Sequence, residues 1–301
     1  MQFFFVVLLS LMTSAVLAHT RGFVHNIHYG VFDPASTPLG DVLYIHGYGD
    51  TFENHLPLFS AWTGKGLRVV AFDLPSHGKS AGGLRNDLNF YGFEELATLA
   101  GEVWRATSTG SNRPLFLAGW STGGLLVTRM VQSEKMRKAL PEISGVITFA
   151  PAVAPQTCVG NTFCQITNGT LTHAPELQNR SIKPKSPFSR PVFASKLLAN
   201  SQLAWHRPVK GDLPFLTFVA SDTEDFYVKT PGVKLWIQSM NKKFGSSITG
   251  VQCPLARHEL DNEPKEYGGD QVREMATDFF LKIIRQQEFN PMGYQGPCLA
   301  L

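Results

Sequence analysis

Short apolar runs alternate with amphipathic stretches along most of this chain of 301 residues. Six runs rich in β-branched and aromatic residues predict strands at Val42–Ile45, Leu67–Phe72, Pro114–Ala118, Gly145–Phe149, Phe215–Ala220 and Ser247–Gln252. Helical periodicity predicts helices near Phe93–Thr107, Gly123–Leu140, Pro231–Phe244 and Gln271–Gln287. Because the strands are apolar throughout, the pattern predicts an α/β fold whose mostly parallel sheet is covered by helices on both faces.

One interval interrupts this alternation. Residues 152–213 are rich in proline, asparagine and serine, contain two cysteines and show little strand pattern. We expect an insert there, so that residues 19–151 and 214–301 form one core domain. The insert also holds two N-glycosylation sequons, at Asn168 and Asn179, which matter only if the source glycosylates.

Composition agrees with a globular protein that buries a large core. Apolar residues make up 43% of the chain and charged residues 17%. The net charge is only +3 and the basic residues are scattered, so the sequence predicts no nucleic-acid partner. Beyond the first residues no segment is apolar enough to cross a bilayer, so any membrane contact would be peripheral.

The first 18 residues carry no charged side chain. Their apolar run is short for a spanning helix, and Val16-Leu17-Ala18 supplies small residues at the −3 and −1 positions of a cleavage site. We interpret residues 1–18 as a secretory signal peptide, which predicts an exported protein, secreted or periplasmic. The run lacks the usual Lys or Arg at its start, and an uncleaved N-terminal anchor is the alternative.

Four cysteines are consistent with export. An even number in an oxidising compartment favours disulfides, and four cysteines allow three pairings. We favour Cys158 with Cys164, which closes a small loop, and Cys253 with Cys298, which ties down the C-terminal tail. The chain has no CxxC or HExxH motif, so the sequence predicts no metal site.

The candidate chemistry begins at Gly119-Trp120-Ser121-Thr122-Gly123, between a predicted strand and a predicted helix. A turn sharp enough to lift one side chain clear of a sheet needs small neighbours, and G-x-S-x-G is the nucleophile-elbow pattern. Ser121 would lie at a helix N-terminus, where free N–H groups favour developing negative charge. The alternative is that Ser121 only caps the helix.

A serine nucleophile needs a base, which the elbow pattern places late in the chain. His258 follows the last predicted strand by a few residues and precedes the final helix. An unremarkable surface histidine is the alternative, but the chain order Ser…Asp…His favours a catalytic role. Other histidines lie near the mature N-terminus or in the insert: His19, His25, His28, His173 and His206.

The third residue of such a serine–histidine–acid triad should be a carboxylate after the strand Phe215–Ala220. Asp222, Glu224 and Asp225 all follow that strand. An apolar residue three positions after the acid normally anchors such a loop, and Val228 stands there for Asp225. We therefore prefer Asp225; Asp222, closer to the strand end, is the second candidate and Glu224 the third.

Two backbone N–H groups would bind the oxyanion. One is that of Thr122, the residue after the serine. The other is that of Tyr48 in the stretch YIHGYGD, whose glycines allow the backbone to turn over the sheet. A dinucleotide-binding loop does not fit, because Phe52 stands where the third glycine belongs. We expect His77 in FDLPSHGKS to be structural, holding its loop beside the oxyanion turn.

Four motifs in this order resemble the α/β-hydrolase superfamily, and within it the monoacylglycerol lipase and lysophospholipase-like serine hydrolases. They are HG-x-G-[DE] at His46–Asp50, D-x-x-x-HG-x-S at Asp73–Ser80, G-x-S-x-G at Gly119–Gly123, and the late His258. The resemblance spans roughly residues 40–285, interrupted by the insert. The acid loop departs from the family's G-x-x-D spacing by one or two residues, so the resemblance does not by itself choose the acid.

The resemblance implies a cap formed by the insert, no cofactor, and hydrolysis of carboxylic esters, often lipid monoesters such as monoacylglycerols or lysophospholipids. Ser121, His258 and Asp225 would act through an acyl-enzyme. The partner would then be a small ester or lipid.

Other functions would require other residues. A proline iminopeptidase-like enzyme would need cap acids to bind a free amino terminus. The insert instead carries basic residues, which suit an anionic head group or form a solvated face: Arg180, Lys183, Lys185, Arg190 and Lys196. Epoxide hydrolases and haloalkane dehalogenases need a carboxylate in place of Ser121. A non-catalytic exported binding protein should have lost a triad residue or filled its oxyanion loop, and neither has happened.

Overall fold

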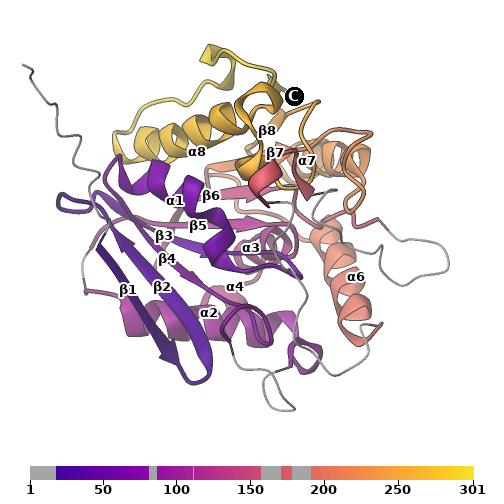
Figure 1. Cartoon of the computed structure of the whole chain (residues 1–301). Helices are drawn as coiled ribbons and strands as arrows, with labels where there is room; N and C mark the ends of the chain where they lie inside the picture. Colours follow the sequence, from indigo (N-terminus) through magenta and orange to yellow (C-terminus); the bar gives the residue numbers. More distant parts are fainter. Residues whose placement is uncertain (1–17, 81–86, 111, 157–170, 178–190) are drawn as a thin grey trace, which may run out of the picture.

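A single nine-stranded sheet organises the part of the chain that the computed structural model describes, residues 18–80, 87–110, 112–156, 171–177 and 191–301 (Figure 1). Its strands are β1 Ala18–Val24, β2 Ile27–Asp33, β3 Gly40–Ile45, β4 Leu67–Phe72, β5 Leu115–Trp120, β6 Ile143–Phe149, β7 Phe215–Val219, β8 Ile248–Gln252 and β9 Leu299–Ala300. Their order across the sheet is β1-β2-β4-β3-β5-β6-β7-β8-β9.

The six central strands, β4-β3-β5-β6-β7-β8, are all parallel. At the two edges β1, β2 and β9 pair antiparallel. The predicted mostly parallel sheet is therefore confirmed. Each central strand was predicted to within a few residues, because strands buried on both faces read as continuous apolar runs. All residues of β3 to β5 are buried.

Helices cover both faces of the sheet (Figure 1). Side chains of α1 and α8 pack on one face, and those of the other helices on the opposite face. The helices of the described residues are α1 Leu56–Thr63, α2 Phe93–Thr107, α3 Thr122–Gln132, α4 Glu134–Arg137, α6 Pro191–His206, α7 Thr230–Phe244 and α8 Gly269–Ile284. Along β3, Leu43 and Ile45 point to the α2–α3 face, and Val42 and Tyr44 to the α1–α8 face.

The structure corrects one predicted helix. The stretch Gly123–Leu140 forms two helices, α3 and α4, because Ser133 between them has extended backbone (φ −128°, ψ 112°). The backbone oxygen of Ser133 accepts N–H groups of Met136 and Arg137, which starts the second helix. Further elements had no prediction: β1, β2, β9, α1 and α6.

A disulfide joins Cys253, just after β8, to Cys298, just before β9. This is one of the two predicted pairs, and it holds the C-terminal tail against the edge of the sheet. Both cysteines are buried. The other predicted pair, Cys158 with Cys164, lies outside the described residues, as do the sequons at Asn168 and Asn179.

Residues 1–17 of the predicted signal peptide also lie outside the described residues. Of the predicted insert the structure describes residues 152–156, 171–177 and 191–213, the last of which contains α6. No helix in the described part of the chain has the length and apolar character that crossing a bilayer requires.

Candidate active site

Ser121 occupies a strained turn between β5 and α3. Its backbone dihedrals are φ 53° and ψ −115°, a region that residues with a side chain rarely adopt. The turn brings α3 so close to β3 that a Cβ at Gly123 would lie 2.0 Å from the backbone oxygen of Ile45. The Ser121 side chain makes no capping hydrogen bond to α3. The turn therefore presents the hydroxyl above the sheet, as an elbow does.

The hydroxyl is the first member of a hydrogen-bonded chain of three side chains. Ser121 Oγ lies 2.9 Å from Nε2 of His258, and Nδ1 of His258 lies 2.9 Å from Oδ2 of Asp225. Since the carboxylate can only accept, Nδ1 carries the proton and Nε2 can accept the hydroxyl proton. Such an arrangement can activate a hydroxyl as a nucleophile.

The structure distinguishes the three acids that the sequence offered. Oδ1 of Asp225 accepts the N–H groups of Tyr227 and Val228, both at 2.9 Å, which leaves Oδ2 directed at His258. Asp222 is exposed and pairs with Lys234 at 2.8 Å. Glu224 lies 3.4 Å from Arg257 Nε. Only Asp225 among the three acids contacts His258.

The two predicted oxyanion donors flank this serine. Thr122 is the first residue of α3, and Tyr48 lies in the loop after β3, next to Gly47. A Cβ at Gly47 would lie 2.6 Å from the Trp120 ring and 3.0 Å from Ser121 Cβ, so this loop packs directly on the elbow. Tyr48, Ser121, Thr122 and His258 all line one cavity.

Two buried histidines hold the oxyanion loop to the loop after β4. Nε2 of His46 accepts the N–H of Leu74, and Nε2 of His77 accepts the N–H of Gly49, both at 2.9 Å. Each ring donates its Nδ1–H to a nearby carbonyl, that of Gly47 or Pro75. Burial lowers the pKa of His46 to about 3, with help from the neighbouring His77, and burial lowers the pKa of His77 to about 4. Both rings are therefore neutral acceptors near pH 7.

The cavity at Ser121 measures about 70 Å³ and is mostly apolar. Among the described residues no carboxylate or cationic side chain lines it. Its walls are Tyr48, Trp120, Ser121, Thr122, Ala152, Pro155, Gln156, Leu171, Leu197, Tyr227, Val228 and His258. Larger open grooves of about 710 and 810 Å³ lie around Glu142 and Lys210. They are at the amino-terminal ends of the parallel strands, away from Ser121, His258 and Asp225.

Both longer described parts of the predicted insert contact the site. On α6, the Phe193 ring stacks on the Tyr48 ring with centroids 5.6 Å apart. Lys196 Nζ donates to the backbone oxygens of Asn89 at 2.7 Å and Tyr91 at 3.1 Å, so this lysine docks the helix on the core. In residues 171–177, the backbone oxygen of Leu171 accepts the N–H of Glu259, next to His258.

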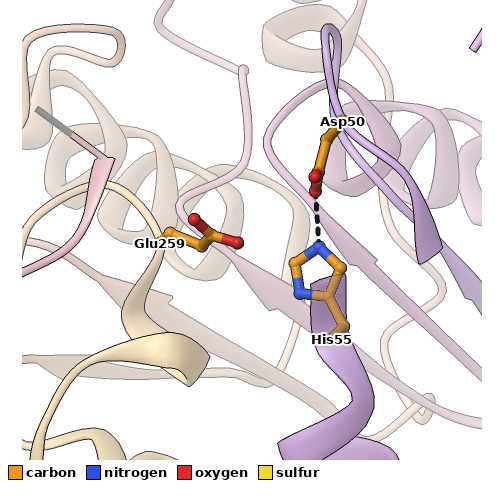
Figure 2. Close-up of side chains that lie close together, drawn as sticks. All are labelled: Asp50, His55 and Glu259. Carbon is orange, nitrogen blue, oxygen red and sulfur yellow. Dashed lines mark hydrogen bonds and ion pairs between the residues drawn. The ribbon is translucent and has the colours of Figure 1, made fainter. Parts of the chain in front are cut away.

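Within the described residues, one group of side chains brings three potential metal ligands together: Asp50, His55 and Glu259 (Figure 2). Their ligand atoms lie within 4.8 Å of one another and all three residues are buried. However, Nε2 of His55 lies 2.7 Å from Asp50 Oδ2, and its Nδ1 lies 2.6 Å from Asp261 Oδ2. A metal ion on His55 would have to replace one of these hydrogen bonds, and the absence of a metal site stays a prediction.

No motif in the sequence predicted this buried group. Asp50 was noticed only as part of a motif, and His55 had no interpretation. His55 and Asp261 are 206 positions apart, so no spacing in the sequence links them. The residues around His55 carry no local pattern that would have indicated this contact.

The fold and this site define a serine-centred α/β-hydrolase. A family model described as serine aminopeptidase, S33, matches residues 36–264, and the chain belongs to that family. No curated protein matches the chain.

Solved structures agree on the fold. The monoacylglycerol lipase of Paleococcus ferrophilus is similar with a TM-score of 0.62 and 21% identity, over 85% of this chain and 99% of that one. A soluble variant of the monoglyceride lipase of Saccharomyces cerevisiae gives 0.64 and 16%, over 90% and 97%. A carboxyl esterase of Bacillus coagulans gives 0.68 and 16%, over 89% and 99%. Identities this low establish the fold alone.

Because His77 is neutral in the folded protein, we expect the free energy of unfolding to fall in acid. Its folded pKa lies below the ordinary value, so the unfolded chain binds the proton more tightly, and stability falls as the pH drops from about 6.5 towards 4. Replacing His77 by Gln, which keeps an acceptor oxygen, should remove on the order of 3 kcal/mol of this pH dependence.

Chemical denaturation at several pH values between 7 and 4 measures the effect. The exposed His206→Gln serves as the control and should follow the parent protein. If the His77→Gln and parent curves ran parallel, His77 would not be the neutral acceptor described here.

Proposed function

We propose that this protein hydrolyses carboxylic esters, with lipid monoesters such as monoacylglycerols or lysophospholipids as substrates. The observation that carries the proposal is the continuous chain from Ser121 Oγ through His258 to Asp225, with both contacts at 2.9 Å. Fold alone would not carry it, because one fold hosts many activities.

In the proposed reaction, His258 Nε2 takes the proton of Ser121 as Oγ bonds to the ester carbonyl carbon. Asp225 keeps Nδ1 protonated and stabilises the imidazolium. The carbonyl oxygen becomes an oxyanion, which the N–H groups of Tyr48 and Thr122 bind; each such donor lowers the barrier by about 3 kcal/mol. The alcohol leaves with the proton from Nε2, and water then cleaves the acyl-enzyme by the same steps.

The cavity supports an uncharged, apolar acyl group. Its described lining is aliphatic and aromatic apart from the reacting groups and Gln156. An acyl chain bound there would bury its apolar surface away from solvent, and it would leave no charged group unpaired. The similar structures named above include two monoglyceride-type lipases and a carboxyl esterase, in keeping with this substrate class.

Peptidase activity is the alternative, because the family's description names an aminopeptidase. An enzyme of that kind has to pair the ammonium group of a free amino terminus. Burying that group without a carboxylate is costly, and no carboxylate lines the cavity within the described residues. This observation favours an ester with a neutral acyl part.

A binding protein without catalysis is the other alternative. It would have no need for a serine held in a strained turn within reach of a histidine. The joint presence of the strained Ser121, the oriented His258 and the buried Asp225 favours catalysis.

We also propose that the protein is exported after removal of residues 1–18. The disulfide between Cys253 and Cys298 supports this proposal, because disulfides persist mainly in oxidising compartments.

Exchange of the acid tests the triad. We expect Asp225→Asn to lower kcat on the order of 10⁴-fold, because the amide no longer holds His258 in the required tautomer. Asp222→Asn is the matched control and should leave kcat within about twofold, since Asp222 is an exposed partner of Lys234. The opposite ranking of the two variants in steady-state ester hydrolysis would assign the acid to Asp222.

A matched pair of substrates tests the substrate class. The p-nitrophenyl esters of propionic acid and of alanine differ only by the α-amino group. After correction for uncatalysed hydrolysis, we expect kcat/KM to favour the propionate by at least about tenfold, because the cavity offers the ammonium no partner. A preference for the alanine ester, together with cleavage of alanine p-nitroanilide, would support the aminopeptidase instead.

A further inference from the structure

His55 joins two loops that the proposed reaction depends on. It is the last residue of the 3₁₀ helix Phe52–His55, directly before α1, and is fully buried. Asp50, which its Nε2 contacts, comes two residues after Tyr48 in the oxyanion loop. Asp261, which its Nδ1 contacts, comes three residues after His258. One imidazole ring therefore links the oxyanion loop to the loop that carries the proposed base.

The ring fits this place as a cation. A neutral imidazole has one N–H and could donate to one carboxylate only, whereas an imidazolium can donate to both. Burial opposes the charge, but Asp261 and Asp50 outweigh it and raise the pKa of His55 to about 10. The third carboxylate facing the ring is that of Glu259 (Figure 2).

A second contact joins the same two loops. Asn262 Nδ2 lies 2.8 Å from the backbone oxygen of Asn54 and 2.7 Å from Glu259 Oε1. Asn54 in turn donates its side-chain N–H to Asp50. The link therefore consists of several hydrogen bonds around one buried positive charge.

Trp120 contacts both loops and lies next to the reacting groups. Its ring lies 5.6 Å from the His55 ring and 5.0 Å from the His258 ring, measured between centroids. Its Nε1 donates to the backbone oxygen of His258 at 2.8 Å, and it directly precedes Ser121. Gly47 packs on the same indole. A shift of either loop would therefore move the base or an oxyanion donor relative to Ser121.

We propose that His55 is a positioning residue: as an imidazolium ion it holds the Tyr48 loop and the His258 loop at the separation that the transition state requires. The inference rests on the proposed function. This role of His55 differs from stabilising the fold alone, because the Tyr48 N–H binds an oxyanion that exists only after Ser121 has attacked the ester. Loosening the link should therefore lower kcat more than it raises KM.

The kinetic test breaks the link without changing its net charge. The double variant His55→Gln with Asp261→Asn removes one positive and one negative charge. We expect its kcat for p-nitrophenyl propionate to fall at least about tenfold with KM within about threefold.

Ile248→Ala is the matched control. Ile248 is buried at the start of β8, at the edge of the sheet opposite Ser121, so this variant loses stability without touching the link. We expect it to keep kcat within about twofold at a comparable loss of Tm. Unchanged kcat in the double variant, or a rise in KM alone, would overturn the inference.

Nitrogen NMR of the parent protein gives an answer even if the double variant fails to fold. With histidine labelled in the ring, we expect both nitrogens of His55 to carry protons at pH 8. A neutral ring would overturn the inference. A stoichiometric metal ion in the purified protein, removed by chelator with loss of activity, would overturn it as well.

The ester assay separates the two proposals. A parent protein that cleaves no ester would contradict the proposed function and this inference with it. An active parent with an unaffected double variant would contradict the inference alone.

Discussion

The hydrogen bond between Ser121 Oγ and His258 Nε2 joins residues 137 positions apart, and the proposed chemistry depends on it. The parallel sheet makes this contact possible, because parallel strands have their carboxyl ends at one edge. Ser121 directly follows β5, and the loops that carry Asp225 and His258 follow β7 and β8. The parallel arrangement of these strands therefore serves the site as well as the core.

Buried histidines around the site take opposite charge states because their partners differ. His46 and His77 accept backbone N–H groups, and burial keeps both neutral. His55 is buried to the same degree but lies between two carboxylates, which favour its charged form. The oxyanion loop is thus held on one side by neutral acceptors and on the other by a cation.

The central fold could be predicted from sequence because both faces of its strands are buried, which makes their apolar runs continuous. Glycine spacing indicated Ser121, because the turn around it admits only small neighbours. The chain order Ser…Asp…His then indicated His258. The sequence favoured Asp225 among the three acids after β7 because Val228 stands three positions later, and the loop geometry then brings this acid to His258.

Other features had no local signal. The break at Ser133 lies inside a continuous helical pattern, and α6 lies in a stretch whose composition resembles a loop. His55 depends on contacts with residues five and 206 positions away, which no periodicity reports. Long-range polar contacts of this kind are set by the tertiary fold, so sequence patterns identify the reacting residues more readily than the residues that hold them in place.

The most direct test of the central claim is covalent labelling with a fluorophosphonate probe, followed by peptide mass spectrometry. An activated serine reacts with such a probe, and ordinary surface serines do not. The account predicts a single adduct on Ser121, no adduct in Ser121→Ala, and parental labelling in the exposed control Ser60→Ala. A folded parent protein that took up no probe, or a Ser121→Ala protein that still reacted, would contradict it.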